Sequence, residues 1–279
     1  MPETTPQRRS TRRSSRGLAI GIDVGGTGVK AAVVDLATGE LRSPRVRRPT
    51  PQPATPGAVI EVAAAVVNQL IADGHATPDM PAGCGLPGVV KDGRLKTAAN
   101  IDASWIDAPA QQLLADRLGR PCVIVNDADA AGIAEMAFGA ARDRTGTVLL
   151  LTIGTGIGSA LFVDGVLVPN TELGHVHFHG RIAEALVSAV SRERRKIGWK
   201  RWAREFSAYL ALLESYFWPD LIILGGGISK AFDRYGPHLV SRAPIVTASL
   251  LNSAGIVGAA MTGEHAARTG IASRPSGGG

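Results

Sequence analysis

Short apolar runs alternate along this chain with longer segments in which apolar residues recur at helical spacing. A run that is apolar throughout is typical of a buried strand, whereas apolar residues about three or four positions apart are typical of a helix packed on one side. The pattern predicts strands at 18–26, 29–36, 40–48, 82–88, 121–125, 147–153, 157–163 and 221–227. It predicts helices at 57–73, 109–118, 127–138 and 254–267, another from 228, and a largely helical segment at 181–217. This alternation indicates an α/β fold that collects its ligands at strand ends.

Three of the predicted strands run into glycine-rich turns, which suggests two similar lobes facing a cleft. Glycine allows successive backbone N–H groups to point into one concavity, where they can hold phosphate oxygens. One such turn can be an ordinary hairpin turn, but three at strand ends favour a phosphate site. Asp23 in the first turn is expected to hold Mg²⁺ through water, because Mg²⁺ takes one or two carboxylates together with phosphates. The turns are Asp23-Val24-Gly25-Gly26-Thr27-Gly28, Gly154-Thr155-Gly156-Ile157-Gly158-Ser159 and Gly225-Gly226-Gly227-Ile228-Ser229-Lys230.

Two acids and an amide follow the predicted strand 121–125 directly, in the sequence Asn126-Asp127-Ala128-Asp129. Carboxylate and amide groups can each bridge neighbouring hydroxyls of a sugar. A carboxylate within reach of an attacking hydroxyl orients it and takes its proton, as phosphoryl transfer to a sugar requires. Asp127 could instead do no more than cap the following helix. We interpret Asp127 as the catalytic base.

A second polar cluster, Glu172-Leu173-Gly174-His175, could line the same pocket or merely begin a helix. The loop-like residues at 86–88 and Asn100 could contribute to that pocket as well. His175, His177 and His179 occupy alternate positions, which would place them on one face of a strand. Such a face could suit a metal, although no cysteine or acid completes the set.

Composition and charge narrow the class of protein. The chain is 45% apolar and 19% charged, contains no apolar run long enough to span a bilayer, and has no apolar signal core at its N-terminus. Its two cysteines form no ligand cluster. We therefore expect a cytoplasmic protein with no membrane partner.

The formal net charge of +6 is concentrated in three basic blocks, which attract polyanions or simply form solvated surface. No nucleic-acid recognition motif accompanies them, so no nucleic-acid partner is expected. The first block lies in residues 1–16, which we expect to be disordered. The other two are Arg42, Arg45, Arg47 and Arg48, and Arg192, Arg194, Arg195, Lys196, Lys200, Arg201 and Arg204.

The motifs DVGGT, NDADA, TIGTGIGS, ELGH and LGGGISK, in this order, resemble those of the ROK family of sugar kinases and regulators. The resemblance covers roughly residues 18–267. More narrowly, GIDVGGTGVK, PTPQPATP, NDADAAG and NSAGIVGAA resemble the polyphosphate glucokinase branch, which includes polyphosphate/ATP glucomannokinases. The resemblance implies a two-lobed ribonuclease H-like, actin-like ATPase fold with the sugar in the cleft, and a homodimer.

This resemblance also implies an activity: transfer of a phosphoryl group from inorganic polyphosphate, with ATP as a second candidate donor, to the 6-hydroxyl of glucose. Asp127 would be the base and Mg²⁺ the cofactor. No structural zinc is expected, because no cysteine follows Cys122 and the polyphosphate branch lacks that site. Glucose would contact Asn100, Asn126, Asp127, Glu172, His175 and Glu184. The donor would contact Asp23, Gly25, Gly26, Thr27, Lys30, Thr155, Gly156, Gly225, Gly226 and Gly227.

We expect an N-terminal lobe at 17–126, a C-terminal lobe at 127–253, a final helix at 254–268 that packs back towards the N-terminal lobe, and a flexible tail at 269–279. The segment 192–204 is the first candidate for binding a polyphosphate tail. Two alternatives stay open: an ATP-dependent kinase for another hexose such as mannose, and a non-catalytic sugar-sensing regulator. Residues 1–16 are too short for a helix-turn-helix domain, and regulators tend to lack the catalytic carboxylate that Asp127 supplies.

Overall fold

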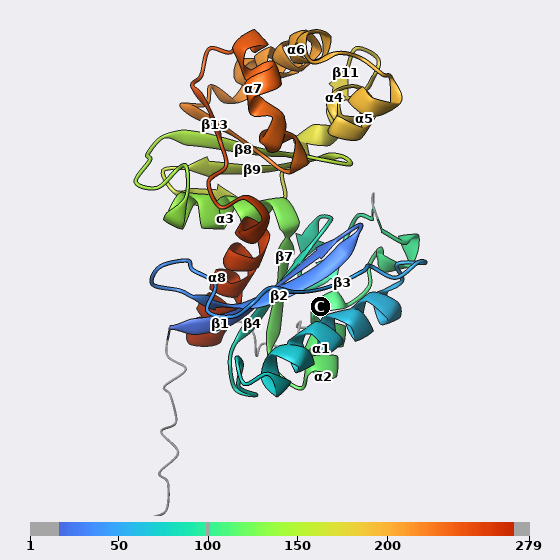
Figure 1. The fold of residues 1–279 in the computed structure, drawn as a ribbon, viewed down its shortest axis with the longest axis vertical. Helices are drawn as coiled ribbons and strands as arrows, with labels where there is room; N and C mark the ends of the chain where they lie inside the picture. Colours follow the sequence, from blue (N-terminus) through green and yellow to red (C-terminus); the bar gives the residue numbers. More distant parts are fainter. Residues whose placement is uncertain (1–16, 99–100, 271–279) are drawn as a thin grey trace, which may run out of the picture.

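The computed structural model describes residues 17–98 and 101–270, and it forms two stacked lobes, each built on a five-stranded sheet (Figure 1). The predicted disordered head at 1–16, the sugar contact Asn100 and the tail from residue 271 lie outside the described residues. The first sheet has the order β3-β2-β1-β4-β7, and the second has the order β10-β9-β8-β13-β14. The predicted α/β architecture is confirmed.

The two sheets share one topology. In the first, β1 (Leu18–Gly25) and β2 (Gly28–Asp35) form an antiparallel hairpin extended by β3 (Val46–Arg48), and β4 (Ala82–Leu86) and β7 (Cys122–Asn126) add in parallel. The second repeats this with the β8 (Thr147–Ile153), β9 (Ile157–Val163) and β10 (Val166–Val168) meander, followed by the parallel strands β13 (Leu221–Gly225) and β14 (Ile245–Thr247). The carboxyl ends of parallel strands share one edge of a sheet, which is where ligands collect.

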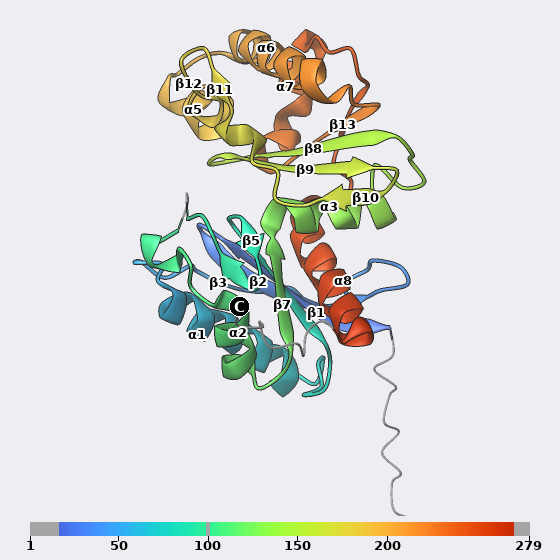
Figure 2. The ribbon, with the colours of Figure 1, turned by 180° about the vertical axis from the view of Figure 1, so that it is seen from behind.

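Helices cover these sheets from outside and also fill the space between them (Figures 1 and 2). The outer helices are α1 (Pro56–Ala72) and α2 (Ala110–Leu118) on the first lobe, and α4 (Glu184–Val187), α5 (Ala189–Arg194), α6 (Trp199–Phe217) and α7 (Phe232–Tyr235) on the second. Between the sheets lie α3 (Asp127–Phe138) and α8 (Ala254–Thr269). One apolar cluster joins these two helices to both sheets, through residues such as Ala32, Ala134, Leu150 and Val257.

The approach between α8 and its neighbours is too close for side chains. A Cβ atom added at Gly258 would lie 1.7 Å from the carbonyl oxygen of Ala130 in α3. One added at Gly83 in β4 would lie 1.9 Å from the carbonyl oxygen of Ala259. Glycine at these positions therefore sets how closely α8 packs on α3 and on the first sheet.

Three details differ from the sequence pattern. The strand expected at 40–48 is reduced to β3, because the Ser43 hydroxyl accepts the Val33 N–H at 3.0 Å and Pro44 has no N–H to donate. The helix expected from 228 is a 3₁₀ segment at Gly227–Ala231 followed by the short α7, which ends before Pro237. The segment 181–217 begins with β12 (Arg181–Ile182), and its helical part is divided into α4, α5 and α6. Within the described residues, no helix is both long and apolar enough to cross a membrane.

Glu135 in α3 is a fully buried carboxylate that holds the segment leading into α8. Its Oε1 accepts the N–H of Leu250 at 2.7 Å, and its Oε2 accepts the N–H groups of Ser249 at 3.0 Å and Ala140 at 2.8 Å. Three backbone donors thus depend on this one side chain.

We expect Glu135→Ala to lower the free energy of unfolding by about 3 kcal/mol, because it leaves these backbone donors without an acceptor. Equilibrium denaturation in urea measures the change. Glu61→Ala is the matched control, since Glu61 pairs with Arg117 on the surface and such pairs contribute about 0–1 kcal/mol. Equal losses in the two variants would contradict a structural role for Glu135.

Candidate active site

A pocket of about 400 Å³ lies where the strand ends of both lobes meet. It collects residues from the ends of β1, β4, β7, β8 and β13, which are the strands that the shared topology directs to one edge. Most of the residues predicted for a site are among its lining. The lining consists of Gly25, Gly26, Thr27, Pro87, Gly88, Thr97, Asn126, Asp127, Thr152, Gly154, Thr155, Gly156, Ile157, Gly158, Glu172, His175, Glu184 and Gly226.

Asn126 ends β7 and caps α3, which leaves Asp127 facing the pocket. The Asn126 Oδ1 accepts the N–H groups of Ala128 and Asp129, each at 2.9 Å, and its Nδ2 donates to the Gly88 carbonyl at 3.0 Å. The Asp127 Oδ1 accepts the Ala128 N–H at 2.9 Å. The helix cap is therefore Asn126, and the alternative that Asp127 serves only as a cap is not supported.

The surroundings of Asp127 favour its protonated form more than water would. Partial removal from solvent raises the pKa of Asp127 to about 7, and the negative charges of Asp23 and Glu172 add to this, against the opposing effect of the Ala128 N–H. A carboxyl group with a pKa near neutrality can take up and release a proton at physiological pH. Asp127 therefore has the electrostatics of a general base.

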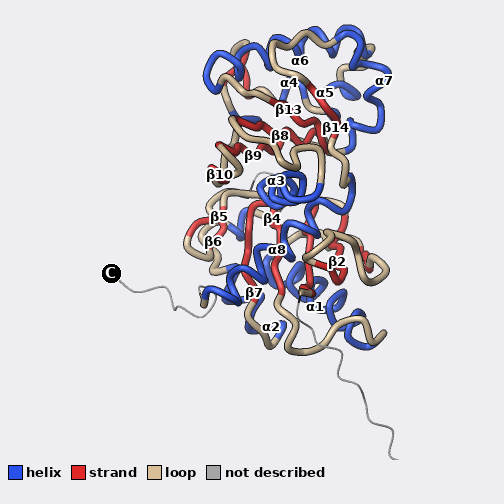
Figure 3. The backbone as a smooth tube through the Cα atoms, turned by 90° about the vertical axis from the view of Figure 1, so that its left-hand side faces the viewer, coloured by secondary structure: helices blue, strands red, loops and turns tan. Residues whose placement is uncertain are grey.

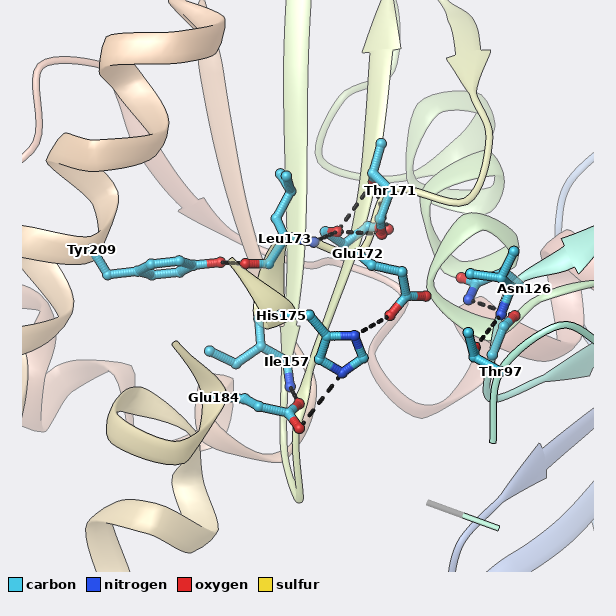
Figure 4. Close-up of polar contacts among 12 residues, drawn as sticks. Thr97, Asn126, Ile157, Thr171, Glu172, Leu173, His175, Glu184 and Tyr209 are labelled. Carbon is cyan, nitrogen blue, oxygen red and sulfur yellow. Dashed lines mark hydrogen bonds and ion pairs between the residues drawn. The ribbon is translucent and has the colours of Figure 1, made fainter. Parts of the chain in front are cut away.

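Glu172, His175 and Glu184 form a row of side chains along the wall of the second lobe (Figure 4). The His175 Nδ1 lies 3.2 Å from the Glu172 Oε2, and its Nε2 lies 3.7 Å from the Glu184 Oε1. Burial raises the pKa of Glu172, while His175 lowers it and Glu184 raises it further. Two carboxylates that hold an imidazole between them offer several hydrogen-bond acceptors to a polyhydroxyl ligand.

Buried hydrogen bonds fix the segment that carries this row. The Ser159 Oγ donates to the Thr171 carbonyl at 2.6 Å and accepts the Leu173 N–H at 3.0 Å. The Tyr209 hydroxyl donates to the Leu173 carbonyl at 3.0 Å (Figure 4). Although Ser159 ends the second glycine turn, its hydroxyl is committed to this segment and Ser159 does not line the pocket, so this hydroxyl is not placed to contact a phosphate. Tyr209, which lies far away in the sequence, carries no motif that could have revealed its role.

All three glycine turns contribute to the pocket lining, through Gly25–Thr27, Gly154–Gly158 and Gly226. The second turn touches the polar row, because the Ile157 N–H donates to the Glu184 Oε2 at 3.1 Å. Gly226 has a φ of +76°, and a Cβ there would lie 2.6 Å from backbone atoms of Ile153, so the turn requires glycine. Gly225 and Gly227 are not part of the lining.

Asp23 and Lys30 lie outside the pocket lining and are paired across β1 and β2. The Lys30 Nζ lies 2.8 Å from the Asp23 Oδ2, and the Asp23 Oδ1 has no hydrogen-bond partner within residues 17–98 and 101–270. A single carboxylate with one free oxygen, two residues before a glycine turn that lines the pocket, fits a Mg²⁺ ion held through water. It does not fit an ion enclosed by protein ligands alone.

The expectation of three histidines on one strand face is wrong. His175 ends a 3₁₀ turn, His177 begins the two-residue strand β11 (His177–Phe178), and His179 has a φ of +48°. The strand between these histidines is only two residues long, so the three side chains do not share one face. Within the described parts of the chain, no group of three or more His, Cys, Asp or Glu side chains is arranged to hold a metal.

The basic block at 192–204 divides into two kinds of side chain. The first kind is engaged with neighbouring groups: Arg192 stacks on the Trp199 ring at 3.9 Å, Arg195 donates to the Leu186 carbonyl and to the Glu205 carboxylate, and Arg201 pairs with the same carboxylate. The second kind is exposed and has no ion pair within the described residues, and we call this set the basic surface. It consists of Arg194, Lys196, Lys200 and Arg204.

Comparison with known proteins gives consistent matches. A model of the ROK family matches residues 19–185. The chain is 45% identical over 261 residues to the polyphosphate glucokinase of Mycobacterium tuberculosis (strain CDC 1551 / Oshkosh), covering 93% of this chain and 95% of the relative. The structure of the inorganic polyphosphate/ATP-glucomannokinase from Arthrobacter sp. strain KM matches with a TM-score of 0.87 and 49% identity, over 90% of this chain and 99% of the other. A ROK family glucokinase from Streptomyces griseus, in complex with glucose and AMPPNP, matches with a TM-score of 0.77 and 27% identity, over 89% and 100% of the two chains.

We expect Asp127→Asn to raise the free energy of unfolding by about 2 kcal/mol at pH 8, because the folded state then no longer holds an ionised carboxylate that is shielded from solvent and lies near Asp23 and Glu172. The pKa of Asp127 rises from 3.8 to about 7 on folding, so the carboxylate costs stability increasingly as the pH rises through this window. The gain should be smaller at pH 5.5, where the folded wild type is mostly protonated. Urea denaturation at both pH values measures it.

The control is Asp143→Asn, since Asp143 is exposed and 3.7 Å from Arg142. This variant should change stability little at either pH. A loss of stability in Asp127→Asn at pH 8 would contradict the electrostatic account of the pocket.

Proposed function

The chain belongs to the ROK family and has its two-lobed ribonuclease H-like, actin-like ATPase fold, and we propose that it is a polyphosphate glucokinase. The reaction moves the terminal phosphoryl group of inorganic polyphosphate to the 6-hydroxyl of glucose. The observation that carries the proposal is one pocket in which Asp127 and the Glu172–His175–Glu184 row face three glycine turns. The 45% identity to a polyphosphate glucokinase supports the choice of donor and acceptor.

Glucose lies against the polar wall in this proposal. Asn126, Asp127, Glu172, His175 and Glu184 all line the pocket and present amide, carboxylate and imidazole groups to its hydroxyls. Asn100 stays a prediction from the family resemblance. Its place in the sequence follows Thr97, which lines the pocket.

Asp127 acts as the base in the proposed reaction. Its carboxylate accepts a hydrogen bond from the 6-hydroxyl, orients the oxygen towards phosphorus, and takes the proton late, since the transition state is loose. The new bond joins the glucose oxygen to phosphorus. The bond between that phosphorus and the bridging oxygen of the polyphosphate breaks, and its electron pair stays on the oxygen of the shortened polyphosphate.

The glycine turns hold the donor. Backbone N–H groups at Gly25–Thr27 and Thr155–Gly156 suit phosphate oxygens, and Gly225, Gly226 and Gly227 form the third turn. The Gly154 N–H donates instead to the Gly156 carbonyl at 3.0 Å. Asp23 is the residue that would hold Mg²⁺, with Lys30 beside it. The bound ion would supply charge neutralisation on the phosphoryl oxygens.

ATP as a second donor and mannose as a second acceptor extend this proposal. The similarity to the Arthrobacter protein, which is a polyphosphate/ATP-glucomannokinase, supports both. The homodimer stays a prediction.

We expect the full chain with glucose and Mg²⁺ to form glucose 6-phosphate from polyphosphate. Asp127→Asn should lower kcat by about 10²–10⁴-fold because it removes the base. A coupled glucose 6-phosphate dehydrogenase assay measures both, with Asp143→Asn as the control. Product from ATP alone would favour the ATP-dependent kinase, and glucose binding without turnover on either donor would favour the regulator.

The basic surface is our candidate for holding the polyphosphate tail. It spans the end of α5, the turn after it and the first turns of α6. The Val190 N–H in α5 donates at 3.3 Å to the carbonyl of Gly154, which belongs to the second glycine turn. Exposed cations attract a long polyanion more than a nucleotide, and salt weakens the attraction. Arg195 is excluded from this role because its guanidinium holds Leu186 and Glu205.

We therefore expect Arg194→Glu with Lys200→Glu to raise the KM for polyphosphate about tenfold at low salt, and the KM for ATP less than about twofold. The difference should shrink as NaCl is increased. Steady-state kinetics at two salt concentrations measures it. Arg142→Glu with Arg144→Glu, on an exposed loop between α3 and β8, makes the same change in net charge and is the control. Equal losses for both donors would sink the tail-binding role.

A further inference from the structure

A chain of hydrogen bonds joins the two lobes beside the pocket. The Asp129 Oδ2 accepts the backbone N–H of Asn170 at 2.8 Å. The Asn170 side chain then pairs with both backbone groups of Val90: its Oδ1 accepts the Val90 N–H at 2.7 Å, and its Nδ2 donates to the Val90 carbonyl at 2.9 Å. We call Asp129, Asn170 and Val90 the interlobe clasp. In the view of Figure 3, the hairpin of β5 (Val90–Lys91) and β6 (Arg94–Leu95), which begins at Val90, lies on the same side of the molecule as β10, which precedes Asn170.

Each member of the clasp is held in place. Asp129 is only 1% exposed in the first turn of α3, and its N–H is bonded to the Asn126 Oδ1. Asn170 has a φ of +60°, a conformation that asparagine tolerates better than most residues. The Asn170 side-chain amide bonds both the N–H and the carbonyl of Val90, as the backbone of a neighbouring strand would. Within the described residues, β5 pairs with β6 alone.

Burying the Asp129 carboxylate costs folding free energy that its hydrogen bonds only partly offset. Its Oδ1 is buried and has no partner within the part of the chain that the structure describes. Burial raises the pKa of Asp129 to about 6, against the favourable bond from the Asn170 N–H. A buried acid with an unmatched oxygen is a poor stabiliser of the fold. What the Asp129 carboxylate does in the structure is hold the backbone of Asn170 in place.

Both ends of the clasp lead directly into walls of the pocket. Val90 follows Pro87 and Gly88, which line the pocket from the first lobe. Asn170 precedes Glu172, which lines it from the second lobe. The clasp therefore fixes the spacing between a wall that belongs to one lobe and a wall that belongs to the other. The glycine turns proposed to bind the phosphoryl donor contribute no hydrogen bond to the interlobe clasp.

We propose that Asp129 and Asn170 are positioning residues that hold the sugar side of the pocket in its binding-competent width. The identity of the sugar rests on the proposed function. Loss of the clasp lets the loop at Val90 move away from Glu172. Part of the binding free energy of glucose is then used to bring the two walls back together, which weakens its apparent affinity. The effect falls on the acceptor and not on the donor.

The sharpest variant is Asn170→Gly, which keeps the left-handed backbone and removes both bonds to Val90. We expect the Kd and KM for glucose to rise about tenfold, with kcat and the KM for polyphosphate within about threefold of wild type. Titration calorimetry with glucose alone and steady-state kinetics measure these values. Asp143→Gly is the matched control, because Asp143 also has a left-handed φ of +61° but lies on an exposed loop.

Conservative replacement and pairing distinguish positioning from general damage. Asp129→Ala should match Asn170→Gly, whereas Asp129→Asn should restore glucose affinity, because its amide oxygen can still accept the Asn170 N–H. The double variant Asp129→Ala/Asn170→Gly should be no weaker than either single variant, since both break one chain of contacts. Additive losses would overturn a shared mechanism.

Hydrogen exchange of the Val90 amide reads the clasp without reference to any activity. Its N–H is bonded in the wild type and should exchange faster in Asn170→Gly. Faster exchange together with weaker glucose binding supports the proposal. If Asn170→Gly binds glucose as tightly as the wild type and turns over at the same rate, the clasp is overturned but the proposed function is not. The same holds if Asn170→Gly loses affinity for glucose and for polyphosphate equally. Failure of the wild type to bind or phosphorylate glucose overturns the proposed function instead.

Discussion

The structure depends on the close packing of α3 and α8 between the two sheets. Glycines at 83 and 258 let α8 approach β4 and α3 to distances that any side chain would prevent. Glu135 then ties α3 to the segment before α8. Because α3 begins at the pocket, this central layer decides where Asp127 stands relative to both sheets.

The pocket that results concentrates negative charge where a negatively charged donor must bind. Lys30 offsets Asp23, and His175 lies between Glu172 and Glu184. Removal from solvent and the negative charges of Asp23 and Glu172 raise the pKa of Asp127, and no cation beside it within the described residues offsets this. The same isolation that costs stability makes this carboxylate a suitable proton acceptor near neutral pH. The phosphoryl donor is left to the backbone N–H groups of the glycine turns and to the ion that Asp23 would hold.

Side chains of one type play opposite parts in this protein, and their contacts decide which. Arg192 and Arg195 are built into the second lobe, whereas Arg194 is exposed beside them. Asp127 faces the pocket, whereas Asp129, two residues on, is turned towards Asn170 and joins the lobes. Two residues correspond to about 200° around an α-helix, so these two carboxylates point to opposite sides of α3.

The sequence by itself determined the alternation of strands and helices, the glycine turns and the place of Asp127 after a buried strand, because these depend on local periodicity and backbone freedom. It also predicted most of the pocket lining through motifs that end strands. Only the tertiary structure decided that Asn126 caps α3, that Ser159 and Tyr209 hold the Glu172 segment, and that the histidines leave a common face. It alone brought Asn170 to Val90, which lies in the other lobe. Those contacts join residues far apart in the chain, and no local pattern encodes which distant backbone group a side chain will meet once the two sheets have packed.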